Sequence, residues 1–156
     1  MSPDDSDGRS WPLSDADYRA IASFRAALRR FLHFSEEAAR AAKISPQQHQ
    51  LLLAIRGFEG AGAPAIGDLA EALQIRHHSC VGLVDRLEQH GFVRRVTGAE
   101  DARMVFVEIS PPGKELLAGL TSAHRHEHGQ LHAILDELAR ASTESDSSGP
   151  DSSIDQ

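Results

Sequence analysis

The stretch from Ile66 to Val107 constrains the fold more than any other part of this 156-residue chain. Apolar residues recur at helical spacing in two short segments, which are separated only by Gln74-Ile75-Arg76. Two segments of alternating apolar and polar residues follow, and a glycine lies in the connection between them. The stretch therefore predicts two helices joined by a tight turn and then a β-hairpin. These four elements are expected at residues 66–73, 77–90, 92–96 and 104–109.

The two predicted helices carry the contacts that a helix-turn-helix requires. Ala70 provides the small residue where the two backbones approach, and apolar residues fall in register where the helices would touch. The apolar set comprises Leu69, Leu73, Ile75, Cys80 and Leu83. With a hairpin behind it, this order is typical of a winged helix-turn-helix, which places its second helix in the major groove of DNA. The predicted fold class is mainly α with a small β-wing.

The polar side of the second helix is the predicted DNA-contacting surface. Its candidate contacts are Arg76, His77, His78, Ser79, Val81, Gly82 and Arg86. In the hairpin, Arg103 is placed to enter the minor groove, where the negative potential of DNA is strongest. Asp101 lies two residues earlier and could hold the guanidinium in position. The alternative interpretation of Asp101 and Arg103 is a solvated ion pair of little energetic weight.

Several short motifs resemble the core of MarR-type transcriptional regulators. They are Leu83-Val84-Asp85-Arg86-Leu87, Gly91 with an apolar residue after it, Arg95, Asp101-x-Arg103 and Ser110-x-x-Gly113. With the flanking helices, the resemblance covers residues 14–140. It implies a homodimer whose first and last helices form the interface, bound to a pseudo-palindromic operator in double-stranded DNA. The chain departs from the family pattern at His77, His78, Gly82 and Ala102, where relatives often carry other residues.

Long amphipathic helices are predicted on both sides of this core. Apolar residues at steps of three and four predict a helix from about Asp15 to Ala42, which would be about 40 Å long. A second long helix should start at Ser110, and its polar middle, His124–His128, suggests a break. A helix that outruns its domain usually buries its apolar stripe against another chain, although packing within a monomer is the alternative. The predicted organisation is a disordered acidic lead (1–13), dimerisation helices (14–45 and 111–141), a winged helix-turn-helix (46–110) and a disordered acidic tail (142–156).

Charge and composition limit the classes of function. The net charge of −7 looks unfavourable for a DNA-binding protein, but the acidic residues gather at the two ends of the chain. DNA binding would therefore depend on local cations. The chain lacks a long apolar run, a signal peptide and a second cysteine, so we expect a cytoplasmic protein with no membrane contact. It also lacks a glycine-rich phosphate loop and a nucleophile elbow, so we expect neither an enzyme nor a cofactor.

The expected function is that of a ligand-responsive repressor with an unknown small-molecule effector. His33 and His49 are the candidate residues of a ligand pocket. Cys80 falls on the apolar face of its helix, where a buried and unreactive thiol is the usual outcome. Two alternatives remain: a winged helix used for protein contacts, and a metal-responsive regulator using His124, His128 and His132. We predict no metal site, because a polar patch in the middle of a helix is more often a solvated or inter-subunit surface.

Overall fold

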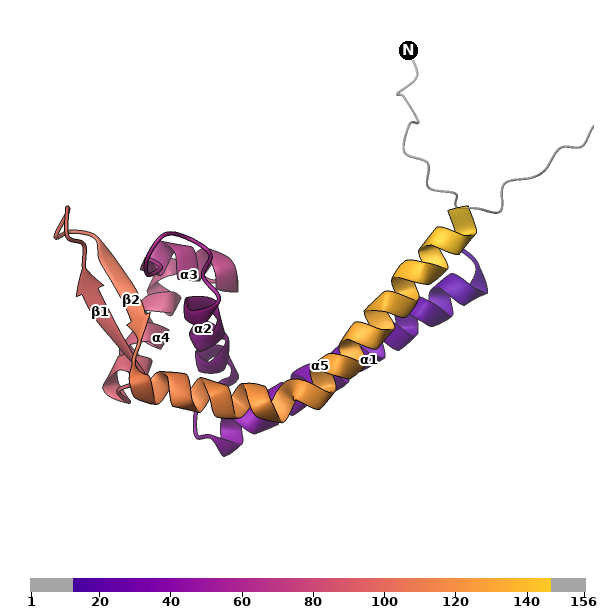
Figure 1. Ribbon diagram of the computed structural model, residues 1–156, viewed down its shortest axis with the longest axis horizontal. Coiled ribbons are helices and arrows are strands. Elements are labelled where there is room, and N and C mark those ends of the chain that lie inside the picture. The colour runs from indigo at the N-terminus through magenta and orange to yellow at the C-terminus, as the bar shows by residue number, and fades with distance from the viewer. Residues whose placement is uncertain (1–12, 147–156) are drawn as a thin grey trace, which may run out of the picture. The chain divides into compact units, whose positions relative to one another are not determined.

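The computed structural model describes residues 13–146 of the chain. In these residues, four helices precede a two-stranded antiparallel sheet and a fifth helix follows it (Figure 1). The elements are α1 (Asp15–Ala41), α2 (Pro46–Arg56), α3 (Ile66–Leu73), α4 (His77–Gln89), β1 (Val93–Thr97), β2 (Val105–Ile109) and α5 (Pro111–Asp146). The chain divides into two compact units, one made of residues 33–125 and the other of the two terminal segments up to Leu32 and from His126. Both α1 and α5 therefore contribute to both units.

The unit of residues 33–125 contains the predicted helix-turn-helix. A capping box starts α2: the backbone N–H of Ser45 donates to Gln48 Oε1 at 2.7 Å, and the Gln48 N–H donates to Ser45 Oγ at 3.1 Å. Pro46 occupies the first helical position, where it has no amide hydrogen to leave unsatisfied. α3 ends at Gln74, which adopts the left-handed conformation with φ 54° and ψ 42°. This conformation makes the tight turn into α4.

The wing is the hairpin of β1 and β2, with Val93 paired to Ile109 and Thr97 paired to Val105. A short edge contact extends it, because Ala65 forms an isolated bridge with Phe106 and the Val107 N–H donates to Pro64 O at 2.9 Å. The contact of Ala65 with the wing is thus a single bridge and not a third strand.

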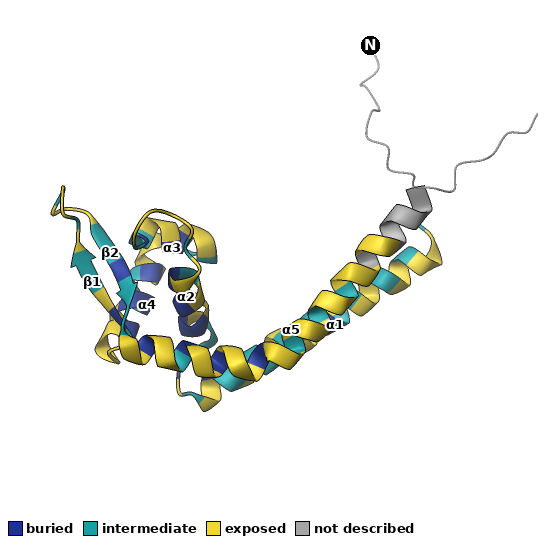
Figure 2. Cartoon of the chain, in the orientation of Figure 1, coloured by how far each residue is buried: buried dark blue, intermediate teal, exposed yellow. Residues whose placement is uncertain are grey.

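The core of this unit fills the space among α2, α3, α4, the wing and the start of α5 (Figure 2). Its largest fully buried side chains include Leu51, Leu52, Leu69, Leu87 and Val107. Each such side chain stabilises the fold by about 1.5–3 kcal/mol through removal of apolar surface from water. Cys80 is fully buried in the same cluster, as the helical pattern predicted.

The other unit pairs the first part of α1 with the last part of α5. Ser14 and Asp17 cap the start of α1, since the Asp17 N–H donates to Ser14 Oγ at 3.2 Å and the Ser14 N–H donates to Asp17 Oδ2 at 2.8 Å. The two helices meet at Phe31 and His128, whose rings pack edge to face with centroids 5.0 Å apart. Large hydrophobic side chains remain exposed in this unit, namely Tyr18, Ile21, Leu32 and Leu135.

The predicted break in the last helix is wrong, because α5 runs without interruption from Pro111 to Asp146. A glycine inside a helix costs about 1 kcal/mol relative to alanine, which packing can offset. Here His124 is buried from the middle of the helix, and its ring packs against Phe34 and His49. The helix also extends past residue 142, where the acidic tail was predicted to begin. The rest of that tail and almost all of the acidic lead lie outside the described residues.

Candidate nucleic-acid interface

Helix α4 presents a buried and an accessible face, as its periodicity predicted. Cys80, Leu83, Val84 and Leu87 are buried. The predicted contacts Arg76, His77, His78, Ser79 and Arg86 are exposed, and Val81 and Gly82 are partly exposed. The structure therefore leaves the whole predicted recognition surface accessible to a ligand.

Gly82 leaves a hollow in this surface. A Cβ added at Gly82 would meet no atom within 4 Å, so the glycine is not required by packing. The hollow has a volume of about 430 Å³ and is bounded by His78, Ser79 and Arg86 on α4 and by Gln47 on α2. The sequence analysis missed Gln47, which lies in the first turn of α2. That turn adds a polar side chain beside the recognition helix.

Arg95 joins α4 to the wing. Its Nη2 donates to Asp85 Oδ1 at 2.6 Å, and its Nη1 donates to Glu88 Oε1 at 2.8 Å. Its backbone N–H also donates to Glu88 Oε2 at 2.9 Å. Burial alone would lower the pKa of Arg95, but the hydrogen bonds and charges of the two carboxylates outweigh it and raise that pKa. The guanidinium is therefore held charged, and it offsets one of the two negative charges of Asp85 and Glu88.

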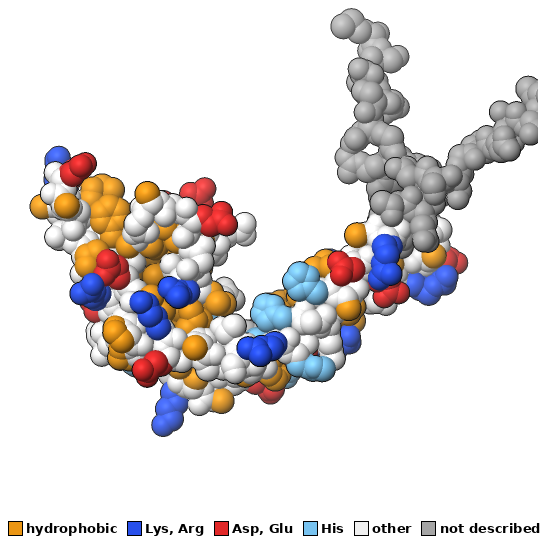
Figure 3. Space-filling view, viewed as in Figure 1, with side chains coloured by type: hydrophobic (Ala, Val, Ile, Leu, Met, Phe, Trp, Pro, Cys, Tyr) orange, Lys and Arg blue, Asp and Glu red, His pale blue; other side chains and the backbone are white. Residues whose placement is uncertain are grey.

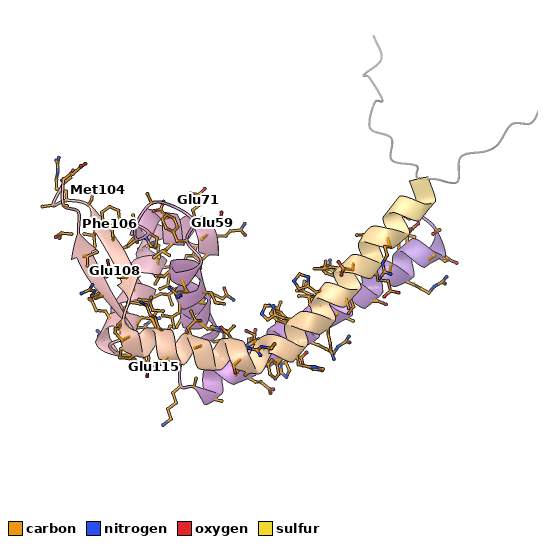
Figure 4. The ribbon with its side chains drawn as sticks, in the orientation of Figure 1. Glu59, Glu71, Met104, Phe106, Glu108 and Glu115 are labelled. Atoms are coloured by element: carbon orange, nitrogen blue, oxygen red, sulfur yellow. The ribbon has the colours of Figure 1, made fainter. Side chains whose placement is uncertain are left out.

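The tip of the wing carries the second predicted contact. Asp101 Oδ1 accepts hydrogen bonds from the backbone N–H of Arg103 at 2.9 Å and from its Nε at 3.2 Å. The Arg103 side chain is nevertheless 92% exposed. Asp101 thus orients the base of a cation whose charge faces solvent, which is the geometry predicted from the Asp-x-Arg spacing. Figure 4 shows Met104 at the same tip, above Phe106 and Glu108 on β2.

The two histidines predicted to line a ligand pocket have different surroundings. His33 is exposed, and its Nε2 lies 3.4 Å from Glu37 Oε1 on the same helix. His49 is buried, and the ring beside it is that of His124, with centroids 5.3 Å apart. Burial and the nearby His124 together lower the pKa of His49. His49 is therefore a core residue, and neither histidine lines the clefts of about 610, 480 and 430 Å³ found in this unit.

The surroundings of Cys80 make its thiol a structural group and not a reactive one. Burial raises the pKa of the Cys80 thiol, which favours the unreactive protonated form. Within residues 13–146, no group of three or more His, Cys, Asp or Glu side chains is arranged to hold a metal ion. The alternative of a metal site at His124, His128 and His132 thus has no support in this part of the chain. The described helices also include none that is long and apolar enough to span a membrane.

The fold and its accessible α4–wing surface define the chain as a winged helix-turn-helix protein. Residues 42–104 match the model of the MarR family, and this segment carries the winged helix-turn-helix of MarR-type transcriptional regulators. The match includes α2, α3, α4, β1 and the tip of the wing.

Individual relatives agree with this assignment. The chain is 35% identical over 86 residues to the uncharacterized HTH-type transcriptional regulator YfiV of Bacillus subtilis (strain 168). That match covers 55% of this chain and 48% of YfiV, so it spans about half the length of this relative. Among solved structures, the S. aureus MepR–DNA complex aligns with a TM-score of 0.63 at 18% identity, over 86% of this chain and 94% of MepR. Apo MarR from E. coli aligns with a TM-score of 0.62 at 20% identity, over 90% of this chain and all of MarR. These structural likenesses show the fold.

Proposed function

We propose that this protein is a sequence-specific DNA-binding transcriptional regulator that acts as a ligand-responsive repressor and binds a pseudo-palindromic operator as a homodimer. One observation carries the DNA-binding part. The accessible face of α4 is accompanied by a wing whose Arg103 is 92% exposed and oriented by Asp101. A helix in the major groove and a cation in the adjacent minor groove form a complementary pair of contacts.

The recognition surface and the wing carry few cations, but these cations are placed where they can contact DNA. Arg76 and Arg86 belong to the recognition surface and are exposed, as is Arg103 in the wing. The two carboxylates on α4, Asp85 and Glu88, are both paired with Arg95. Part of the negative charge that would repel phosphates is thus compensated locally, although the whole chain has a net charge of −7.

The relatives support the same mode of binding. MepR, which shares the fold, has been solved as a complex with DNA. For this chain, two copies of α4 would occupy half-sites about one helical turn apart, as dimeric helix-turn-helix proteins do. The exposed hydrophobic residues of α1 and α5 support the dimer, because large apolar side chains gathered at a surface commonly mark an interface.

The test is operator binding by fluorescence anisotropy, with DNA from upstream of the protein's own gene. We expect binding, and we expect the logarithm of the association constant to fall linearly with the logarithm of the salt concentration. Arg103→Ala should weaken it about 10-fold and reduce the salt slope, whereas the matched control Arg19→Ala, on α1, should bind like the parent. Absence of any salt-dependent binding at low salt would reject this function in favour of a winged helix used for protein contacts.

A further inference from the structure

Gly82 lies at the centre of the accessible face of α4. Successive residues of a helix are about 100° apart around its axis, which places Gly82 opposite the buried side chains of Cys80, Val84 and Leu87. Gly82 itself is partly exposed. The backbone of this glycine therefore faces any partner that binds the outer side of the helix.

The fold does not require a glycine at this position. Gly82 is in the interior of α4, where glycine is among the least favourable residues. The positive-φ glycines found among the described residues are Gly62 and Gly91, so Gly82 is not needed for a left-handed turn. An added Cβ would meet no atom of the chain within 4 Å. The missing side chain is therefore explained by a partner that approaches the backbone and not by packing within the chain.

The hollow at Gly82 has a carbon floor and a polar rim. Ile75 and Leu83 line it with apolar side chains, and Gly82 contributes its Cα. The exposed residues of its lining are all polar or charged, namely Gln47, His78, Ser79 and Arg86. A polar group seated on the floor would lose water without a hydrogen-bond partner, whereas a methyl group would gain by burial. The floor therefore favours an apolar group that belongs to a polar partner.

The charges around the hollow suit double-stranded DNA as that partner. Arg86 is part of the rim, and Arg76 is exposed at the start of the same helix. The wing adds Arg103, and Figure 3 shows basic and acidic side chains together at the tip of the wing. These cations can contact phosphates while the floor of the hollow meets the edge of a base pair.

We propose that Gly82 reads a T·A base pair, with the C5-methyl group of thymine against the Gly82 Cα and between Ile75 and Leu83. Thymine carries the apolar group of the major-groove edges, whose other reading groups are hydrogen-bond donors and acceptors. A Cβ at position 82 would occupy the place of this methyl group. The inference rests on the proposed DNA binding and adds a base that the recognition surface selects by shape.

The test removes the methyl group alone. Duplexes that the full chain selects from a random DNA library are resynthesised with deoxyuridine in place of one thymine at a time, which leaves the hydrogen-bonding groups of the base unchanged. Fluorescence anisotropy then measures the affinity. We expect a thymine in the half-site at which deoxyuridine weakens binding about 4-fold, the effect of one buried methyl group. At the same position, 5-methylcytosine should bind about 4-fold more tightly than cytosine.

Gly82→Ala should remove both methyl effects at that position or reverse them, because its Cβ takes the place of the methyl group. The deoxyuridine duplex should still bind this variant, since it leaves room for the Cβ. The matched control is Gly119→Ala in α5, another exposed helical glycine whose added Cβ meets no atom within 4 Å. Both variants should melt at a higher temperature than the parent, but the control should keep the methyl effects.

The outcomes separate this inference from the function on which it rests. Salt-dependent binding without any methyl-sensitive thymine would overturn the inference and leave the proposed DNA binding intact. A Gly82→Ala variant that keeps the methyl effects, or that binds neither duplex, would also overturn it. Loss of the methyl effects in Gly119→Ala would assign them to helix stability and reject the role of Gly82. Absence of salt-dependent binding to any DNA of the library would reject the proposed function, and this inference with it.

Discussion

Gln74 and Gly91 adopt the same kind of left-handed backbone at the ends of α3 and α4, with φ of 54° and 76°. An L-residue in this region has its Cβ close to the following carbonyl, which costs about 1–2 kcal/mol. Gln74→Gly should therefore raise the free energy of unfolding by about 0.5–1 kcal/mol, after the greater flexibility of glycine in the unfolded chain is included. Gly91→Ala should lower it by about 1 kcal/mol, since the added Cβ meets no atom within 4 Å and only the backbone term remains.

Urea denaturation measures both changes. Gln74→Ala is the control, because it keeps the left-handed strain and should show no gain. A stabilising Gly91→Ala would contradict the backbone argument, as would a Gln74→Gly variant that is less stable than Gln74→Ala.

His49 should make stability depend on pH. Its pKa in the folded protein is lowered, first by burial and then by the nearby His124. The folded state therefore holds His49 neutral in a range where the unfolded chain, with a pKa of about 6.5, takes up a proton. Stability is full above that value and is lost as the pH falls from it toward the lowered pKa.

The measurement is the free energy of unfolding at pH 7.5 and pH 5.5. His49→Met should show a smaller loss between these two values than the parent, whatever its absolute stability. His33→Gln, at an exposed histidine, is the control and should lose as much as the parent. An equal loss in the parent and in His49→Met would assign the acid sensitivity to other groups.

At the scale of the elements, Arg95 fixes the wing to α4. Arg95→Met should lower the free energy of unfolding by about 1 kcal/mol, because it removes the side-chain hydrogen bonds that the 26% exposed Arg95 donates to Asp85 and Glu88. Arg94→Met is the matched control: its pair with Glu108 is on the exposed side of the same strand, where such pairs contribute about 0–1 kcal/mol. Chemical denaturation compares the free energies of unfolding of the two variants. An equal loss in both would contradict the role of Arg95 in fixing the wing to α4.

The elements themselves could be predicted because their signals are local. The period of α4 and the alternation in the wing each reside in a few neighbouring residues, and the structure confirms them. The Asp101–Arg103 contact spans two residues and was predicted for the same reason.

Features that depend on distant segments could not be predicted. Gly113 carried a family motif, but its reason is spatial: a Cβ there would lie 2.1 Å from Phe92 O, so α5 can start against β1 only with glycine. The partners of Arg95, seven and ten residues away, also come together only when the elements pack. The prediction of a break in α5 was wrong because it was based on the sequence of that helix alone. The contacts that bury His124 come from Phe34 and His49 on other helices.

At the scale of the whole molecule, the exposed apolar side chains at the terminal helices support the proposed dimer. Tyr18 is 57% exposed, Ile21 43% and Leu32 44% on α1, and Leu135 is 42% exposed on α5. A second copy of the chain offers the same residues, so an isologous interface would bury all of them at once. This arrangement also explains why α1 and α5 continue beyond the unit that carries the wing.

We therefore expect the parent protein to be a dimer by light scattering at micromolar concentration, and Ile21→Glu to be a monomer. A buried carboxylate on each side of the two-fold axis would be unpaired, which costs far more than the interface gains from one isoleucine. Operator affinity should fall at least 100-fold in the monomer, since the second half-site no longer benefits from linkage to the first. Leu53→Glu is the matched control, because Leu53 is 45% exposed on α2 in the other unit and should leave the dimer intact. If Ile21→Glu remains a dimer, the terminal helices are not the interface. If it becomes a monomer with full operator affinity, the two half-sites are bound independently, and spacing between the recognition helices cannot be what an effector controls.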